Sequence, residues 1–327
     1  MGSSLRSSGH SSGSDAQDIS HGSTSRRRNR RSGGRDAARL RALAAKLGEN
    51  LEVCAQESEP KVEAVHQVRT GTRRIEALLE ALWAAMARRP AECEPAAGAQ
   101  ERYEEMFGRW RALLRKVRQA AAPVRDLDVH RKLLGGLIER WSAADSGPEA
   151  NLHQQAGHLD AWLRSHRARA ARPLGRRAAK WAGKLDSLVT ATSEALAGLP
   201  LPAGARRRNA GARTALDAFA RLSAEIELLH GENLHDFRKG AKKARYMAEA
   251  DGADAYAGEV GKAIKRVQDA IGDWHDWEML AEEAREALGD VELADYLAGA
   301  RDRRYAEAVR ITQTMRGRLM GEWRSIA

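Results

Sequence analysis

Two stretches of this sequence repeat one pattern of side chains: HQVRTGTRR, His66 to Arg74, and HDFRKGAKK, His235 to Lys243. Each has a histidine, an arginine three positions later, a glycine two positions after that, and a basic pair at the seventh and eighth positions. Repetition at a fixed offset is typical of a chain built from related units, so the two copies predict an internal repeat.

Both stretches are amphipathic when placed on an α-helix, which turns about 100° per residue. One side is apolar, with Val65, Val68, Ile75, Leu78 and Leu79 in the first copy and Leu234, Phe237, Ala244 and Ala248 in the second. The other side carries the candidate binding residues, which are His66, Arg69, Arg73 and Arg74 beside Thr70, and His235, Arg238, Lys239, Lys242, Lys243 and Arg245 beside Tyr246. Each helix is expected to bury one side and to offer the other.

The basic sides contain almost no acidic residue to balance them, apart from Glu76. Exposed helix faces usually mix signs, because like charges three or four positions apart repel each other by a few tenths of a kcal/mol per pair. A repeated, unbalanced face favours a bound anion over a merely solvated surface. Gly71 and Gly240 also repeat, which indicates a close approach to the backbone by a ligand or by a packed helix.

Further basic residues at helical spacing are expected to join this surface or to serve only as solubilising charge. They are Arg115, Arg118, Arg125, Lys262, Lys265 and Arg266. A second pair of related strings, VRDLDV (Val124 to Val129) and GDWHDW (Gly272 to Trp277), is matched by aligning Asp128 with Asp276. That alignment predicts 21 extra residues between the two motifs of the first half, near Arg89 to Gln100.

Composition predicts an all-α fold. Of the 327 residues 43% are hydrophobic and only 5% are aromatic, and no alternating β-branched run is present. Helices are expected from 36 onward and at 61–88, 99–121, 124–140, 151–171, 174–197, 211–229, 233–250, 254–271, 274–288 and 292–320.

Four segments follow from these boundaries. Residues 1–35 are expected to be a disordered tail, and their first part, MGSSLRSSGHSSG, resembles a leader added for expression. Residues 36–198 form a first helical unit, 199–210 with LPLPAG a linker, and 211–327 a second helical unit.

The net charge of +10 is weak support for a polyanion partner by itself, because the tail alone contributes about half of it. Cys54 and Cys93 do not form a disulfide or zinc pattern, and neither a secretory signal nor an apolar span is visible. A cytoplasmic protein without metal or cofactor is expected.

The doubled HxxR pattern, HQVRTGTRR before VRDLDV and HDFRKGAKKARYMAE before IGDWHDW, resembles the CHAD family over about residues 36–327. The resemblance implies two antiparallel four-helix bundles related by pseudo-twofold symmetry around a central basic channel. It also implies non-catalytic binding of inorganic polyphosphate and association with polyphosphate granules. Glu76 stands where the second copy has Arg245, and Thr70 where it has Lys239, so the first half is expected to bind more weakly.

Two other functions stay open. His235-Asp236 and His275-Asp276 are HD pairs, as in metal-dependent phosphohydrolases of HD type. RRRNRR, Arg26 to Arg31, and the scattered tryptophans leave room for nucleic-acid binding, although the tryptophans are not interleaved with the basic residues. No pattern in the chain indicates a membrane partner, and the oligomeric state is not predicted.

Overall fold

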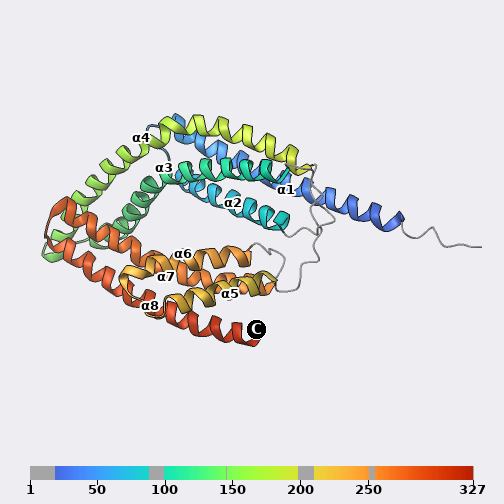
Figure 1. Ribbon diagram of the computed structural model, residues 1–327. Coiled ribbons are helices and arrows are strands. Elements are labelled where there is room, and N and C mark those ends of the chain that lie inside the picture. The colour runs from blue at the N-terminus through green and yellow to red at the C-terminus, as the bar shows by residue number, and fades with distance from the viewer. Residues whose placement is uncertain (1–18, 88–98, 145, 198–209, 250–254, 327) are drawn as a thin grey trace, which may run out of the picture.

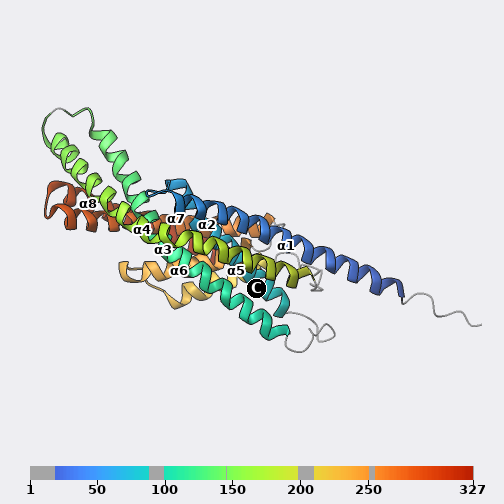
Figure 2. The same ribbon diagram turned by 90° about the horizontal axis from the view of Figure 1, so that it is seen from above.

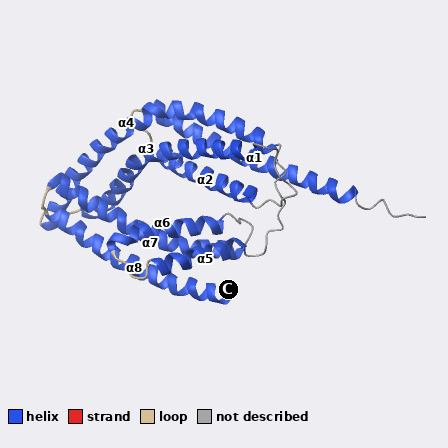
Figure 3. Ribbon diagram, viewed as in Figure 1, coloured by secondary structure: helices blue, strands red, loops and turns tan. Residues whose placement is uncertain are grey.

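The computed structural model describes residues 19–87, 99–144, 146–197, 210–249 and 255–326 (Figure 1). These ranges contain α-helices and no strand (Figure 3), which confirms the all-α prediction. The eight helices are α1 (Ile19–Gln56), α2 (Val62–Ala87), α3 (Ala99–Trp141), α4 (Pro148–Ala197), α5 (Ala210–Glu225), α6 (Gly231–Glu249), α7 (Ala255–Leu288) and α8 (Glu292–Ile326).

Three pairs of expected helices are single helices in the structure. Helix α3 runs through Pro123, and α4 runs through Pro173. Both prolines are exposed, and α3 and α4 change direction part-way along (Figure 1). An interior proline removes one backbone hydrogen bond and kinks a helix, but tertiary packing on both sides keeps the helix going. Helix α7 also continues through the break expected between 271 and 274.

Helix α1 begins at Ile19, so residues 19–35 are helical and not disordered as expected. Adding a residue to an existing helix is far easier than starting one, and no proline interrupts this segment. Residues 1–18, most of the expected linker and the expected insertion site at 89–98 lie outside the described residues.

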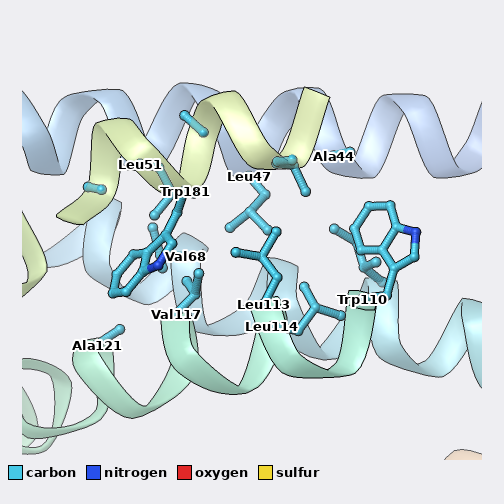
Figure 4. Packing of buried hydrophobic residues seen from close by; sticks show 14 of the residues in the cluster. Ala44, Leu47, Leu51, Val68, Trp110, Leu113, Leu114, Val117, Ala121 and Trp181 are labelled. Carbon is cyan, nitrogen blue, oxygen red and sulfur yellow. The ribbon is translucent and has the colours of Figure 1, made fainter. Parts of the chain in front are cut away.

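A first hydrophobic cluster joins α1, α2, the first half of α3 and the second half of α4 (Figure 4). Leu47 and Leu51 of α1 meet Val68 of α2 and Leu114 of α3 there, all nearly or fully buried. Trp110 donates from Nε1 to Oγ1 of Thr192 at 2.8 Å, which satisfies its only polar atom inside the core.

A second cluster joins α5, α6, the first half of α7 and the second half of α8. Phe219 of α5 and Phe237 of α6 pack edge to face there, with ring centroids 5.8 Å apart. In both groups of four, consecutive helices are neighbours and the last helix contacts the first.

A third cluster holds the two groups together at one end of the molecule (Figures 1 and 2). It combines the second half of α3 and the first half of α4 with the corresponding parts of α7 and α8. Trp141 and Tyr296 meet across it with ring centroids 5.1 Å apart. Residues from both expected units therefore share a core, and the twofold relation between the units stays a prediction.

A buried ion pair fastens α3 to α4 beside the first cluster. Arg167 donates from Nε to Oδ1 of Asp128 and from Nη2 to the carbonyl oxygen of Pro60 at 2.7 Å. The Asp128 side chain has no exposed surface and that of Arg167 is only 6% exposed. Asp128 of the VRDLDV string therefore lies within the packed structure.

Candidate anion-binding site between α2 and α6

Helices α2 and α6 bury the sides that their sequences mark as apolar. All nine predicted apolar positions are buried, among them Val65 and Ile75 of α2 and Leu234 and Phe237 of α6. The two helices belong to different four-helix groups and face each other in Figure 1. Their basic sides are therefore available to act on a common space.

Both repeated glycines lie against a packed helix, but only Gly240 is too close to it for a side chain. A Cβ on Gly240 would lie 2.5 Å from Cδ1 of Leu222 in α5, and a Cβ on Gly71 would lie 3.5 Å from Cδ1 of Leu47 in α1. Of the two alternatives left open by the sequence, the close neighbour is thus a packed helix.

Lys242 of α6 is the point at which the two basic sides converge. The pKa of this half-buried amine falls to about 7, first because burial disfavours its charged form and then because four guanidinium groups repel it. Those groups are Arg73 and Arg69 of α2 and Arg238 and Arg245 of α6. Five of the predicted binding residues, two from the first copy and three from the second, are thereby brought together.

Tyr246 lies inside this group of cations. The guanidinium carbon of Arg245 is 4.9 Å from the centre of the Tyr246 ring, and Nζ of Lys242 is 6.0 Å from it. Burial lowers the pKa of Arg73, and the hydrogen bond between Arg73 and Tyr246 opposes that shift. A tyrosine ring attracts cations through its negative face, so Tyr246 offsets a part of their repulsion.

Two arginine nitrogens in the group are buried without a hydrogen-bond acceptor. They are Nε of Arg73 and Nε of Arg245. Nε of Arg245 is 3.1 Å from Oε1 of Glu249, close enough for an ion pair but not aligned as a hydrogen bond. Buried cationic donors without acceptors are costly, and an anion would supply the acceptors.

The arginine of each HxxR pattern faces an aspartate on the next helix. Arg69 donates from Nη1 to Oδ1 of Asp126 at 2.7 Å. Burial raises the pKa of Asp276, and the charge of Arg238 is the strongest influence that lowers it again. Asp126 and Asp276 are therefore equivalent positions in the two halves, each facing the arginine of its own HxxR pattern.

This match corrects the predicted alignment, in which Asp128 was paired with Asp276. Buried positions of α3 and α7 coincide at an offset of 150 residues, as in Trp110 and Val260, Leu114 and Ile264, Val117 and Val267. The first half therefore has 19 extra residues between its motifs, not 21. Part of the difference lies in the helices, because α2 runs seven residues further past its histidine than α6 does. The sequence misled because both strings contain several aspartates, and only burial distinguishes them.

The two motif histidines lie beside the group and differ in their surroundings. His235 is exposed on its outer side, and its ring centre is 5.4 Å from that of His275. The part of the ring that is covered by neighbours, followed by the charge of Lys239, lowers its pKa. His66 is half-buried, and its Nε2 is 3.5 Å from Oγ1 of Thr70. The lowered pKa of His235 disfavours its charged form in the free protein.

Other predicted residues occupy more open positions. Arg74, Lys239 and Lys243 are exposed, and Lys239 donates to Oδ1 of Asp236 at 3.0 Å. Glu76, the acidic residue on the basic side of the first copy, pairs with Arg118 of α3. Nη2 of Arg118 is 3.2 Å from Oε1 of Glu76.

The other basic residues that the sequence suggested for this surface lie on α3 and α7. None of them is among the four arginines whose charges act most strongly on Lys242. Lys262 donates to Oε1 of Glu259 at 2.7 Å, Lys265 pairs with Asp269, and both lysines and Arg266 are exposed on α7. Arg115 is exposed and Arg125 half-buried on α3.

Neither a metal-binding cluster nor a membrane-spanning helix occurs among the described residues. No group of three or more His, Cys, Asp or Glu side chains in these ranges is arranged to hold a metal ion. None of the described helices combines the length and the apolar character that crossing a membrane requires. Cys54 is a buried thiol whose pKa rises to about 11 through burial, and Cys93 lies outside the described residues.

Comparison with known proteins shows to which family the chain belongs. A sequence model of the CHAD domain matches residues 103–285, more than half of the chain. The chain belongs to the CHAD family. The matched CHAD segment runs from α3 into α7 and contains the second basic motif, while the first lies before it.

Among the solved structures that match this CHAD protein is PptA from Streptomyces chartreusis, with 18% sequence identity and a TM-score of 0.49 over 89% of this chain and 99% of that one. No curated protein matches the sequence.

Proposed function

We propose that the protein binds inorganic polyphosphate in a basic channel between α2 and α6, without catalysing its turnover. The convergence of Arg69, Arg73, Arg238 and Arg245 on Lys242 carries this proposal. Such a group opposes its own charge in the free protein, and the repulsion is relieved once a polyanion lies among the cations.

A linear phosphate polymer fits the layout of the cations along the helices. Arg238 and Arg245 are seven residues apart on α6, which is about 10 Å along a helix. Arginine offers two parallel donors to a phosphate, and lysine offers a compact point charge. A flexible chain with one charge per phosphate meets both helices and releases its counterions on binding.

Family membership supports the same ligand, because the CHAD resemblance implies polyphosphate binding. The protein is then expected to accumulate on polyphosphate granules in the cytoplasm. Affinity should fall as salt rises, and also as pH rises through neutrality, because Lys242 loses its proton near pH 7 in the free protein.

The direct test is calorimetric titration with polyphosphates of defined length. Replacing both HxxR arginines, Arg69→Ala with Arg238→Ala, should weaken binding at least tenfold, because each is worth about 1.5–3 kcal/mol as a charged hydrogen-bond donor. The matched control is Arg285→Ala with Arg310→Ala, which removes the same charge from exposed positions of the second half. Equal affinity of a folded HxxR variant and this control would place the ligand elsewhere.

Two further measurements separate the alternatives. Release of phosphate from a triphosphate substrate only with added divalent metal would favour the phosphohydrolase of HD type around His235-Asp236 or His275-Asp276. Displacement of labelled polyphosphate by single-stranded nucleic acid at equal charge would favour nucleic-acid binding. If the proposed function is correct, neither metal-dependent phosphate release nor displacement by nucleic acid should be observed.

A further inference from the structure

Helix α4 carries a second run of positive charge, away from the space between α2 and α6. No acidic residue occurs between Asp160 and Asp186, a stretch that contains eight arginines and lysines. Six of the eight are exposed on one side of the helix and form what we name the α4 stripe: Arg169, Arg172, Arg176, Arg177, Lys180 and Lys184. Turning about 100° per residue, they span an arc of roughly 140°.

The opposite side of α4 is apolar and packs against the other helices. Leu163, Ala171, Leu174, Ala178 and Leu185 are buried against the cores. A Cβ on Gly175 would lie 3.0 Å from the carbonyl oxygen of Cys54, so α1 and α4 are in close contact there. The orientation of α4 is therefore determined by its apolar side, and the stripe is held outward.

The stripe lies on the far side of the first group of helices from α6. The second half of α4, which carries the stripe, packs in the first core with α1 and α3, whereas α2 faces α6, and Figure 1 shows α4 on the outside. None of the four arginines that act on Lys242 belongs to α4. The stripe and the central group are thus separate surfaces.

Little in the described part of the chain neutralises the stripe. None of its six side chains forms an ion pair with a described carboxylate, whereas other exposed basic residues, such as Arg109 with Glu105 and Lys262 with Glu259, do so. Arg169 contacts His166, a group without a negative charge at neutral pH. Among the described residues, no ion pair therefore offsets the repulsion between neighbouring like charges along about 22 Å of helix.

The chemistry of the stripe favours a phosphate polymer over other polyanions. A membrane-binding helix needs large apolar side chains among its basic ones, and the exposed large hydrophobics of the described residues are Val62 and Leu228, neither on α4. Single-stranded nucleic acid is held by exposed aromatic rings, but Trp181 between Lys180 and Lys184 is buried. Arginine and lysine alone suffice for a chain that presents only phosphates.

We infer that the α4 stripe is a second polyphosphate-binding surface, which holds a segment of chain outside the central site. This inference rests on the proposed function for its ligand and extends it. One protein molecule can then bind a long polyphosphate chain at two places. It can also bind two chains at once, which cross-links them. Two linked sites raise the apparent affinity for chains long enough to reach both, without any new contact.

The test compares three variants of the full chain with the wild type. The stripe variant is Arg172→Gln/Arg176→Gln/Lys180→Gln, the central variant is Arg69→Ala/Arg238→Ala, and the control is Arg285→Gln/Arg303→Gln/Arg310→Gln. The stripe variant should bind long polyphosphate at least tenfold more weakly than wild type, with a salt dependence lower by about two in slope for three lost contacts. The control should stay within about twofold, because Arg310 is already paired with Glu307 and Arg285 lies on a different helix from Arg303 and Arg310.

Stoichiometry with a short polyphosphate distinguishes failure of this inference from failure of the proposed function. Two bound chains are expected for wild type and one for each binding variant. If the central variant binds none, or the stripe variant matches the control, the stripe is not a site. If the stripe variant binds none while the central variant matches wild type, the proposed central site fails and the stripe stands.

Two additional measurements check that the variants are folded and that polyphosphate is the preferred ligand. Circular dichroism and the melting temperature check folding, and Arg177→Gln/Lys184→Gln replaces the stripe variant should that variant not fold. Double-stranded DNA serves as the competing ligand. The choice of polyphosphate would be overturned if the central variant bound this DNA more tightly than polyphosphate of equal charge and the stripe variant did not bind the DNA.

Discussion

The guanidinium group of Arg238 occupies the space that a side chain at Gly272 would need. A Cβ built on Gly272 would lie 2.7 Å from Nη2 of Arg238, well inside van der Waals contact. Because Gly272 is buried in α7 next to the group around Lys242, this glycine determines where Arg238 points.

Gly272→Ala is therefore expected to weaken polyphosphate binding without unfolding the protein. Alanine stabilises a helix interior by up to about 1 kcal/mol relative to glycine, and the flexible guanidinium moves aside. Affinity in calorimetry should fall roughly threefold to tenfold, as for one displaced charged donor. Gly258→Ala on the same helix, which meets nothing within 4 Å, is the matched control. Equal affinities for the two variants would contradict the role of Gly272.

Lys242→Met is expected to stabilise the free protein at and below neutral pH. The pKa of Lys242 is about 7 in the folded protein and about 10.5 when unfolded, so between these values the unfolded state binds one more proton. Wild-type stability should therefore rise between pH 7 and pH 10, and below pH 7 the whole penalty remains. Methionine removes this dependence.

Melting temperatures without ligand at pH 6, 8 and 9.5 measure this effect. Lys243→Met, the exposed neighbour, should reproduce the wild-type trend. A trend unchanged by Lys242→Met would mean that Lys242 keeps an ordinary pKa.

Glu76→Gln is expected to strengthen polyphosphate binding. Glu76 pairs with Arg118, and the two side chains are each 27% exposed, so the substitution removes a negative charge and frees a guanidinium. A change of about 1 kcal/mol, or roughly fivefold tighter binding, is reasonable for one partly screened charge. Glu105→Gln, whose carboxylate pairs with Arg109 further from the site, serves as the comparison in the same titration. Weaker binding by Glu76→Gln would mean that its pair with Arg118 positions the site.

Asp128→Asn is expected to destabilise the protein strongly, because it leaves Arg167 buried without its counter-charge. Breaking a buried ion pair typically costs about 3–5 kcal/mol in the free energy of unfolding. Asp126→Asn removes a carboxylate that is 53% exposed and should cost less than about 1 kcal/mol. Urea unfolding of both variants measures the difference. Similar midpoints would show that the Asp128 pair contributes little.

Local pattern sufficed to predict the all-helical fold and the buried sides of α2 and α6. The spacing of Val65, Val68 and Ile75 marks one buried side of α2 because helical periodicity is a property of neighbouring residues. The basic side of each HxxR helix followed from the same geometry. The prolines misled, because Pro123 and Pro173 weaken a helix locally but cannot report the packing that holds it together.

The sequence by itself determined an all-helical protein with an internal repeat and two unbalanced basic faces. Only the tertiary structure decided that Lys242 meets arginines from both halves, that Asp126 rather than Asp128 matches Asp276, and that a third core joins the halves. Those relations depend on contacts between residues far apart in the chain. Helical periodicity shows which side of a helix is buried, but the shapes of the packed side chains decide which helix covers it.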